Sequence, residues 1–320
     1  MTHQHHHECL PFAARIAAIA FVLMPLQGTC EPVSLPAETA VEEVVVSAPE
    51  PRYVAPTTRD RIGRIWAPVL LNGKGPYRLV LDTGASHSAI VQRVADELAL
   101  PVKARAVRLK GVTGSTVVST ARVESLEFGE LRVDHLKLPI VEAAFGGADG
   151  VHGSDGLKDK RIVIEFRKDR ITVVRSHRTP ANPAYAVVPF KYDPLKGMRV
   201  EIMVGRVKAV GIIDTGAQVT VGNLALRDAL KRSAVEGDAG DVGIEGVTGE
   251  VQFGTRIRVP DIALAGLSLH SPRLLFSDVH IFDQWHLTRD PALLIGMDIL
   301  GVLDTLVIEY RRSELHIKTR

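Results

Sequence analysis

The sequence predicts an all-β protein made of two similar lobes, and three observations support this. Hydrophobic residues make up 46% of the 320 residues and aromatic residues only 5%. Val and Ile recur in short runs broken by Gly, a pattern typical of strands with aliphatic cores. At roughly 150 residues per domain, the length allows two units with cores of their own. Finally, segments of the first half recur in the second half, as they would in a duplicated unit.

The charge balance argues against a nucleic-acid partner. The chain has 39 Lys and Arg against 37 Asp and Glu, so its net charge of +2 creates no long-range field that would attract polyanions. We therefore expect no nucleic acid among its partners.

The first thirty residues have the pattern of a secretory signal peptide. A polar stretch, Met1–Arg15, precedes the apolar run Ile16–Leu26, which is too short to span a bilayer. We expect residues 1–30 to be removed on export to the periplasm or the extracellular space, leaving no membrane span. Two alternatives remain, a buried helix of the mature fold and lipidation at Cys30, although Thr29 and Gln27 fit a lipidation signal poorly.

Residues 31–58 are rich in Pro, Glu and Ala and predict an extended linker. Its apolar island Glu42–Ala48 is similar to short docking segments that pair with a periplasmic partner by adding a strand, but a plain linker explains it as well. The linker is also long enough for a short propeptide. It has few basic residues that could pair with carboxylates, which counts against that role.

The internal repeat defines the two lobes. Four pairs of segments match in order: Asn72–Ala85 with Val204–Ala217, Lys110–Gly114 with Glu245–Gly249, Gly153–Asp155 with Gly296–Asp298, and Ile164–Arg167 with Ile308–Arg311. The offset grows from 132 residues at the first pair to 144 at the last, so the second copy carries an insertion around Ser271–Pro291. The sequence therefore predicts an N-terminal lobe over residues 59–180 and a C-terminal lobe over residues 181–320.

Within each copy, hydrophobic patterning and turn residues predict the same elements in the same order. Apolar strands, Leu79–Leu81 and Val210–Ile213, lead into the two Asp-Thr-Gly-Ala segments, and short helices follow at Ile90–Leu100 and Leu224–Lys231. A hairpin over Arg105–Arg122 turns at Gly-Val-Thr-Gly, and Glu250–Val259 is the outgoing arm of its counterpart. Hairpins close both copies, and the prolines of Thr179–Pro183 suggest a hinge between them. The closing hairpins are Ile162–Phe166 with Ile171–Val174, and Leu306–Tyr310 with Glu314–Ile317.

Two Asp-Thr-Gly segments in matched contexts can supply a pair of carboxylates for acid–base catalysis, which a single segment cannot. Two carboxylates held close together cannot both ionise cheaply, so they share one proton. The ionised carboxylate can then take a proton from water while the protonated one donates to a substrate carbonyl. Such a site needs neither a metal nor a cofactor, and the sequence contains no HExxH, CxxC or GxSxG motif.

The segments Leu79–Ile90, Gly211–Gly222 and Leu293–Leu300 resemble the aspartic peptidases, and in detail their retropepsin-like branch. Aspartic proteases are the standard example of paired carboxylates sharing a proton. The resemblance covers about residues 60 to 320 and implies a bilobal aspartic-protease fold with Asp82 and Asp214 as the catalytic pair. By the same resemblance, Thr83 and Thr215 would lock the two loops together. Gly84, Ala85, Gly216 and Ala217 would complete those loops.

The resemblance also implies two flaps that close over an extended peptide. Their tips would be the Gly-Val-Thr-Gly segments, Gly111, Val112, Thr113 and Gly114 in the first copy and Gly246, Val247, Thr248 and Gly249 in the second. The expected partner is a polypeptide substrate, and a single chain would act as a monomer because it supplies both aspartates.

Several residues depart from this pattern or have a second interpretation. His152 replaces the apolar residue that Ile295 provides in the second copy. Both loops continue with Ala where a hydroxyl residue would favour the charged carboxylate, so we expect a working pH milder than the strongly acid range. His87 could tune the site or be a solvated loop residue. Asp155 and Asp298 are expected to cap helices, and Trp285 and Phe282 to pack inside the insertion or to line a specificity pocket.

Two functions remain from the sequence alone. The first is an exported aspartic endopeptidase that activates water between the two aspartates. The second is a non-hydrolytic peptide-binding or sensing protein that uses the same groove to capture a strand. A third interpretation, turns of a duplicated β domain without catalysis, is weakened because both copies keep the aspartate.

Overall fold

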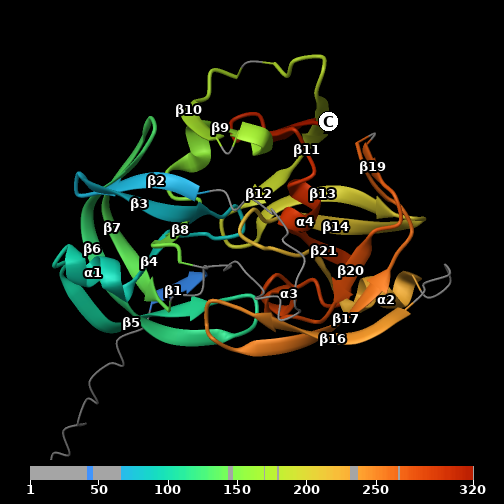
Figure 1. Cartoon of the computed structure of the whole chain (residues 1–320), viewed down its shortest axis with the longest axis horizontal. Helices are drawn as coiled ribbons and strands as arrows, with labels where there is room; N and C mark the ends of the chain where they lie inside the picture. Colours follow the sequence, from blue (N-terminus) through green and yellow to red (C-terminus); the bar gives the residue numbers. More distant parts are fainter. Residues whose placement is uncertain are drawn as a thin grey trace, which may run out of the picture. The chain divides into compact units, whose positions relative to one another are not determined.

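The computed structural model describes residues 42–45, 66–142, 147–168, 170–178, 180–230, 237–265 and 267–319 (Figure 1). The expected signal peptide, Cys30 and most of the linker lie outside the described residues. Strands dominate the described part, as the all-β prediction requires. No helix within these ranges is long and apolar enough to cross a membrane.

The first half of the chain forms an eight-stranded sheet in the order β1-β5-β6-β2-β3-β8-β4-β7. Because β7 also pairs with β6, six of these strands close into a barrel. The parallel pairing of β3 with β8 brings residues 79–81 beside residues 150–152. The strands are β1 (Glu42–Val45), β2 (Trp66–Leu71), β3 (Lys74–Leu81), β4 (Ala89–Val91), β5 (Val102–Lys110), β6 (Ser115–Phe128), β7 (Leu131–Val141) and β8 (Gly150–His152). We call this sheet and its loops the first lobe.

The second half forms a ten-stranded sheet in the order β16-β17-β20-β15-β21-β14-β13-β18-β19, with β12 paired to β13. Here β14 pairs in parallel with β21, as β3 does with β8, so the repeated segments occupy corresponding strands. We call this sheet and its loops the second lobe. Its strands are β12 (Lys191–Asp193), β13 (Gly197–Val204), β14 (Val207–Ile213), β15 (Val221–Gly222), β16 (Gly237–Glu245), β17 (Val251–Arg258), β18 (Ile262–Leu264), β19 (Leu267–Leu269), β20 (Arg273–Phe276) and β21 (Ala292–Ile295).

A third sheet joins strands from both halves in the order β10-β9-β22-β23-β11. Its strands are β9 (Lys160–Glu165), β10 (Arg170–Arg175), β11 (Ala186–Pro189), β22 (Thr305–Glu309) and β23 (Glu314–Lys318). At its centre Val163 pairs with Val307, and these two residues are separated by the same 144 positions that relate the last repeated segments. The strands that contain the last matching segments, β9 and β22, therefore pair with each other in this sheet.

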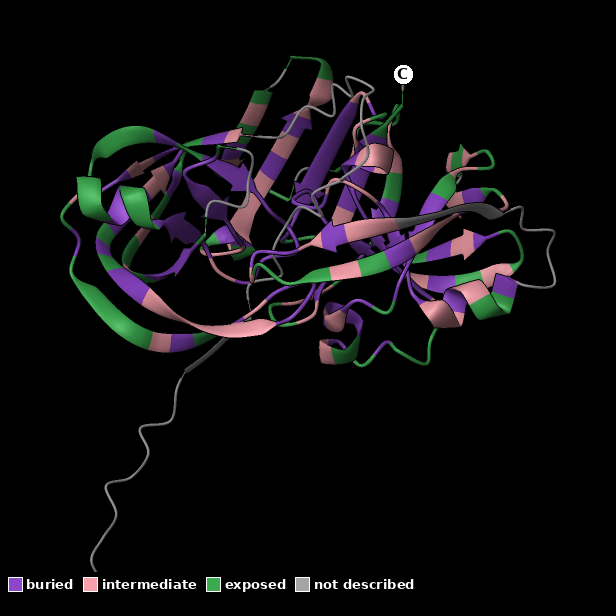
Figure 2. Ribbon diagram, turned by 60° about the horizontal axis from the view of Figure 1, so that its bottom comes forward, coloured by how far each residue is buried: buried purple, intermediate pink, exposed green. Residues whose placement is uncertain are grey.

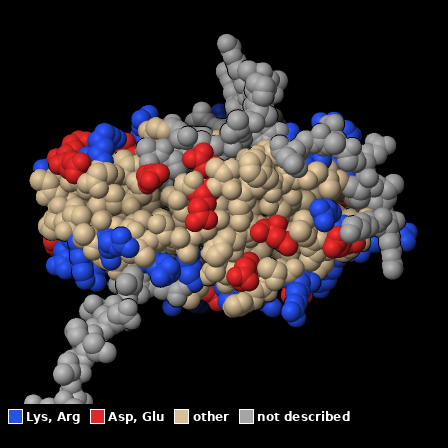
Figure 3. All heavy atoms as spheres, turned by 90° about the horizontal axis from the view of Figure 1, so that it is seen from below, with Lys and Arg blue, Asp and Glu red and all other residues tan. Residues whose placement is uncertain are grey.

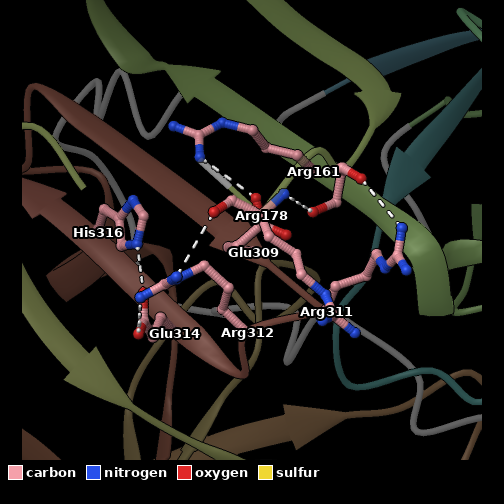
Figure 4. A network of polar contacts seen from close by, with 8 residues as sticks. Arg161, Arg178, Glu309, Arg311, Arg312, Glu314 and His316 are labelled. Carbon is pink, nitrogen blue, oxygen red and sulfur yellow. Dashed lines mark hydrogen bonds and ion pairs between the residues drawn. The ribbon is translucent and has the colours of Figure 1, made fainter. Parts of the chain in front are cut away.

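A polar network lies at the β9–β22 pairing (Figure 4). Arg161 of β9 donates to the buried carboxylate of Glu309 in β22, at 3.3 Å. On the neighbouring strand β23, Glu314 accepts hydrogen bonds from Arg312 and pairs with His316. The buried charge of Glu309 thus has its cationic partner on a strand of the other half, which ties the two halves together electrostatically.

The helices are short and two of them follow the Asp-Thr-Gly-Ala loops. The second, α2 (Leu224–Leu230), lies where the sequence predicts it, whereas α1 (Gln92–Glu97) is shorter than the expected Ile90–Leu100. Ile90 and Val91 instead belong to β4, where they pair with β7 and lie buried. The remaining helices are α3 (His280–Gln284), α4 (Met297–Leu300) and the 3-10 turns η1 (Leu157–Asp159) and η2 (Phe166–Lys168).

The island predicted as a docking segment or a plain linker contains the edge strand β1. Its residues Glu42–Val45 pair in parallel with Val107–Lys110 of β5. Residues 46–48 of the island lie outside the described part.

The core is aliphatic, as the composition predicts. Figure 2 shows buried residues along the inner faces of the strands, while the outward face of α1 is exposed. One buried cluster extends through the first lobe, the shared sheet and part of the second lobe. A second cluster, around α3 and β21, contains Phe282 and Trp285.

Candidate active site

The two Asp-Thr-Gly-Ala loops begin at the ends of corresponding strands. Asp82 follows β3 and Asp214 follows β14. The backbone N–H of Asp82 donates to the carbonyl of His152 at 3.0 Å, and that of Asp214 donates to the carbonyl of Ile295 at 3.0 Å. Each loop is therefore held by the parallel strand beside it, which fixes where its aspartate begins.

Each aspartate is held by its own loop through one oxygen. Oδ1 of Asp82 accepts hydrogen bonds from the backbone N–H groups of Gly84 and Ala85, at 2.8 and 2.9 Å. Oδ1 of Asp214 accepts from Gly216 and Ala217, at 2.9 and 3.0 Å. The Oδ2 atoms of both aspartates are buried and have no partner outside the pair among the described residues. One oxygen on each side is thus left for chemistry.

Two threonines join the loops across the lobe interface. Oγ1 of Thr83 donates to the carbonyl of Ile213 at 2.7 Å, and Oγ1 of Thr215 donates to that of Leu81 at 2.6 Å. The backbone N–H of each threonine donates to the hydroxyl of the other, at 3.1 Å in both cases. These buried bonds are the contacts that the resemblance implies for the threonines, and they hold the two aspartates at a constant separation.

The pair is built to share a proton. The carboxyl groups of Asp82 and Asp214 lie close enough to shift each other's pKa. Burial raises the pKa of both, and the charge of Asp214 raises that of Asp82 further. The backbone N–H donors lower both pKa values only in part. The arrangement can hold one ionised carboxylate as a base beside one protonated carboxyl as an acid.

Beneath the second loop, Asp298 acts as an anchor. Its carboxylate accepts hydrogen bonds from the hydroxyl of Thr220 at 2.6 Å and from the Thr220 backbone N–H at 2.9 Å. The same hydroxyl accepts from the backbone of Gly296 at 3.1 Å. Asp298 is not the N-cap of α4, which is Gly296, but its Oδ1 accepts from the Ile299 N–H in the first turn of α4 at 2.9 Å. The expectation that Asp298 caps this helix therefore holds only in part.

Asp155 plays the corresponding part beneath the first loop. It accepts a short hydrogen bond from the backbone N–H of Ser88 and pairs with His87 at 3.2 Å. It does not cap η1, whose N-cap is Gly156, so that expectation is wrong. His87 is half-exposed and faces Asp155 rather than the aspartate pair, which supports its structural interpretation.

His152 makes the two lobes chemically different. Its imidazole is fully buried, with Nδ1 at 3.0 Å from the hydroxyl of Ser88 and the ring edge-on to Phe128. Nε2 has no hydrogen-bond partner among the described residues. Burial lowers the pKa of His152 to about 4, and the charge of Asp155 opposes this only in part. The imidazole is therefore neutral under mild conditions.

The sequence reasoning missed Ser88 and Thr220. Each hydroxyl residue stands six positions after its aspartate, so the repeat itself contained the signal. Both side chains bond the backbone of a distant glycine, Gly153 in the first lobe and Gly296 in the second. The shared spacing, read together with the Gly-x-Asp repeat, could have identified them as supports of the loops.

The two Gly-Val-Thr-Gly tips meet each other. Thr113 Oγ1 lies 3.4 Å from Thr248 Oγ1, and a Cβ added to Gly111 would stand 3.1 Å from side-chain atoms of Val247 and Thr248. A side chain at position 111 would require Val247 and Thr248 to move by a few tenths of an ångström. Val112 is buried in the cluster around α3, and its carbonyl accepts a hydrogen bond from the Ile281 N–H at 3.1 Å.

The second tip packs toward the first lobe. Val247 is buried in the cluster that contains Ala85, whereas Val112 shares its cluster with Ala217. The turns are closed by bonds from Gly111 to Gly114, at 2.7 Å, and from Gly249 to Gly246, at 3.0 Å. Val247 of the second tip is therefore buried in a cluster that contains Ala85 of the first aspartate loop. Val112 of the first tip is buried in a cluster that contains Ala217 of the second aspartate loop.

The aromatic residues of the insertion serve packing. Trp285 and Phe282 are fully buried beneath the first tip, and the Trp285 indole donates to the carbonyl of Leu195 at 3.1 Å. Neither side chain is free to line a specificity pocket. The sequence did not reveal that this insertion holds the first tip.

No group of three or more potential metal-ligating side chains (His, Cys, Asp or Glu) occurs within the described ranges. The candidate site therefore consists of two aspartates, two threonines and the backbone of two loops.

Comparisons with known proteins agree with this geometry. Residues 67–157 match the sequence profile of the aspartyl protease family. The fold is similar to that in the crystal structure of aspartic proteinase from Irpex lacteus, with a TM-score of 0.50 and 13% sequence identity over 81% of this chain and 95% of that chain. Among curated proteins, none matches the sequence significantly. The first lobe thus matches the aspartyl protease family over residues 67–157, and the chain has the fold of an aspartic proteinase.

Proposed function

We propose that the protein is an aspartic endopeptidase in which Asp82 and Asp214 activate a water molecule that attacks a peptide carbonyl. The observation that carries the proposal is the pair of buried carboxyl groups, each with Oδ1 held by two backbone N–H groups and Oδ2 unpartnered outside the pair. The ionised carboxylate takes a proton from the water and the protonated one donates to the carbonyl oxygen, so no covalent intermediate is needed.

The two Gly-Val-Thr-Gly tips act as flaps in this proposal. They meet through Thr113 and Thr248, and they bury Val112 and Val247. An extended polypeptide would bind beneath them, and their closure would exclude bulk water from the aspartates. Because both aspartates come from one chain, we propose that the enzyme works as a monomer.

The remaining parts of the proposal concern the whole chain. We propose that residues 59–180 and 181–320 are copies of one duplicated unit, which is supported by the parallel pairing of β3 with β8 and of β14 with β21. Export to the periplasm or extracellular space, with a signal peptide over residues 1–30, follows from the sequence pattern. The working pH is mild, because neither loop supplies a hydroxyl to the carboxylates.

The test is cleavage of an unfolded polypeptide between pH 3 and pH 7 by the wild type and by the variants Asp82→Asn and Asp214→Asn. We expect turnover by the wild type alone. Equal turnover by all three proteins would exclude the aspartate pair, and no turnover by any would favour a non-hydrolytic peptide-binding protein. Peak hydrolysis below about pH 3 would contradict the mild working pH. Circular dichroism of both variants serves as the control for folding, since Asp→Asn preserves the size of the side chain.

A further inference from the structure

A cavity of about 730 Å³ lies where the second tip meets the first lobe. Aliphatic side chains of β4 and β7, Val91, Ile140 and Val141, line part of it, and the second tip contributes Val247 and Thr248. Gln92, Thr116 and Ser119 add polar groups to its walls. The volume exceeds that of one side chain, so the cavity can hold a short length of extended peptide. Thr248 lines the cavity and also meets Thr113 of the first tip, so the cavity reaches the place where the two tips meet.

One unpaired carboxylate stands in this cavity. Glu142, directly after β7, is exposed and makes no hydrogen bond or ion pair within the part of the chain that the structure describes. It lies against the second tip, since a Cβ added to Gly249 would stand 3.5 Å from its Oε2. A ligand under this tip would therefore come close to the Glu142 carboxylate.

The cation in the cavity wall does not neutralise Glu142. Arg93 of α1 lines the cavity, but its guanidinium pairs with Asp149 and, at 3.1 Å, with Glu97. Two carboxylates thus already balance this one cation, and the cavity remains negative overall. Seen from below, the surface shows separate Asp and Glu side chains across its middle, with Lys and Arg side chains mainly nearer its edges (Figure 3).

We propose that this cavity is a specificity subsite for a Lys or Arg side chain of the substrate polypeptide, with Glu142 as the residue that selects the positive charge. The inference rests on the proposed peptidase function. Lys and Arg place an aliphatic stem on apolar surface and a cation at its end, which matches aliphatic walls with a single carboxylate. A cationic donor on a carboxylate makes a hydrogen bond about twice as strong as a neutral one.

The test compares peptides that are identical except for Lys or norleucine at one position, scanned through the positions around the cleavage site. At the position that fills the cavity, we expect the wild type to have a kcat/KM about 2- to 5-fold higher for Lys, the range of an ion pair at an exposed carboxylate. In Glu142→Gln the ratio falls to about one, because the carboxylate is lost while the aliphatic walls remain. In Glu142→Lys a peptide with Glu at that position is preferred to the Lys peptide.

Glu250→Gln is the matched control. It also removes one exposed carboxylate beside the tips, but Glu250 lies over Gly114 of the first tip and outside the cavity. We expect this variant to keep the Lys preference. Three outcomes would overturn the proposal. The wild type could show no preference for Lys over norleucine. The preference could survive in Glu142→Gln, or it could be lost equally in Glu250→Gln.

A second readout separates this inference from the proposed function. If the wild type cleaves none of the peptides, the peptidase proposal fails, and binding of the same labelled peptides is measured by fluorescence anisotropy. A lower Kd for the Lys peptide that is lost in Glu142→Gln and kept in Glu250→Gln would still support the subsite. Equal Kd values for the Lys and norleucine peptides at every position would overturn it.

Discussion

The buried histidine beneath the first loop predicts an acid-sensitive fold, and His152→Ile tests it. The substitution places in the first lobe the residue type that Ile295 provides in the second. In the wild type, His152 is fully buried, its Nε2 is unpartnered within the described chain, and its pKa is lowered from 6.5 to about 4. The charge of Asp155 opposes this shift only in part.

The magnitude follows from proton linkage. Above pH 6.5 the imidazole is neutral in both the folded and unfolded states, so its titration does not affect stability. Between pH 6.5 and about 4 the unfolded state binds the proton first, so stability falls as the pH falls, and the loss is complete below about pH 4. A shift from 6.5 to about 4 corresponds to a loss of roughly 3 kcal/mol.

The assay is urea unfolding followed by circular dichroism at intervals from pH 7.5 to pH 3.5. We expect the free energy of unfolding of the wild type to fall by about 3 kcal/mol more than that of His152→Ile over this range. The readout is how much more the unfolding free energy of the wild type falls with pH than that of His152→Ile. The constant offset between the curves at pH 7.5 is not used, because the substitution also removes the hydrogen bond to Ser88. His135→Ala, which removes an exposed imidazole, should run parallel to the wild type. Parallel curves for the wild type and His152→Ile would refute the reasoning.

Three further predictions concern the aspartate loops and the tips. Thr83→Val leaves the Thr215 N–H and the Ile213 carbonyl unpaired, so unfolding free energy should fall by at least about 2 kcal/mol; Thr83→Ser, which keeps the hydroxyl, should lose much less. Ala85→Ser offers a hydroxyl to Asp82, lowers its pKa and should move the acid limb of the pH–activity profile to lower pH, whereas an unchanged limb would contradict this. Val112→Ala should lower kcat/KM by loosening the first tip, with faster hydrogen exchange at the Ile281 amide as the independent measurement.

The repeated segments could be predicted because their signals are local. Aliphatic runs entering Asp-Thr-Gly-Ala, Gly-Val-Thr-Gly turns and closing hairpins depend on backbone preferences and on spacing within a few residues. These are the strands and hairpins that the structure contains, in the predicted order. Matching the two copies also indicated that two aspartates belong to one site.

Errors arose where a distant strand decided the outcome. Ile90 and Val91 satisfy a helical pattern, yet pairing with β7 and β8 places the strand β4 there. Asp155 and Asp298 look like helix caps because each follows a glycine and precedes an aliphatic stretch. Their carboxylates accept from Ser88 and Thr220, which lie 67 and 78 positions away in the chain.

By itself, the sequence determined the all-β class and predicted a two-copy organisation with Asp82 and Asp214 as a pair, because repeated segments and turn residues can be recognised from adjacent positions. Only the tertiary structure decided which carbonyls Thr83 and Thr215 bond between the two loops, that His152 is buried next to Ser88, and that the two tips contact each other. It also brought Glu142 into a cavity with Val91 and Val247. These contacts join residues far apart in the chain, and their energies depend on burial and distance, which no local pattern encodes.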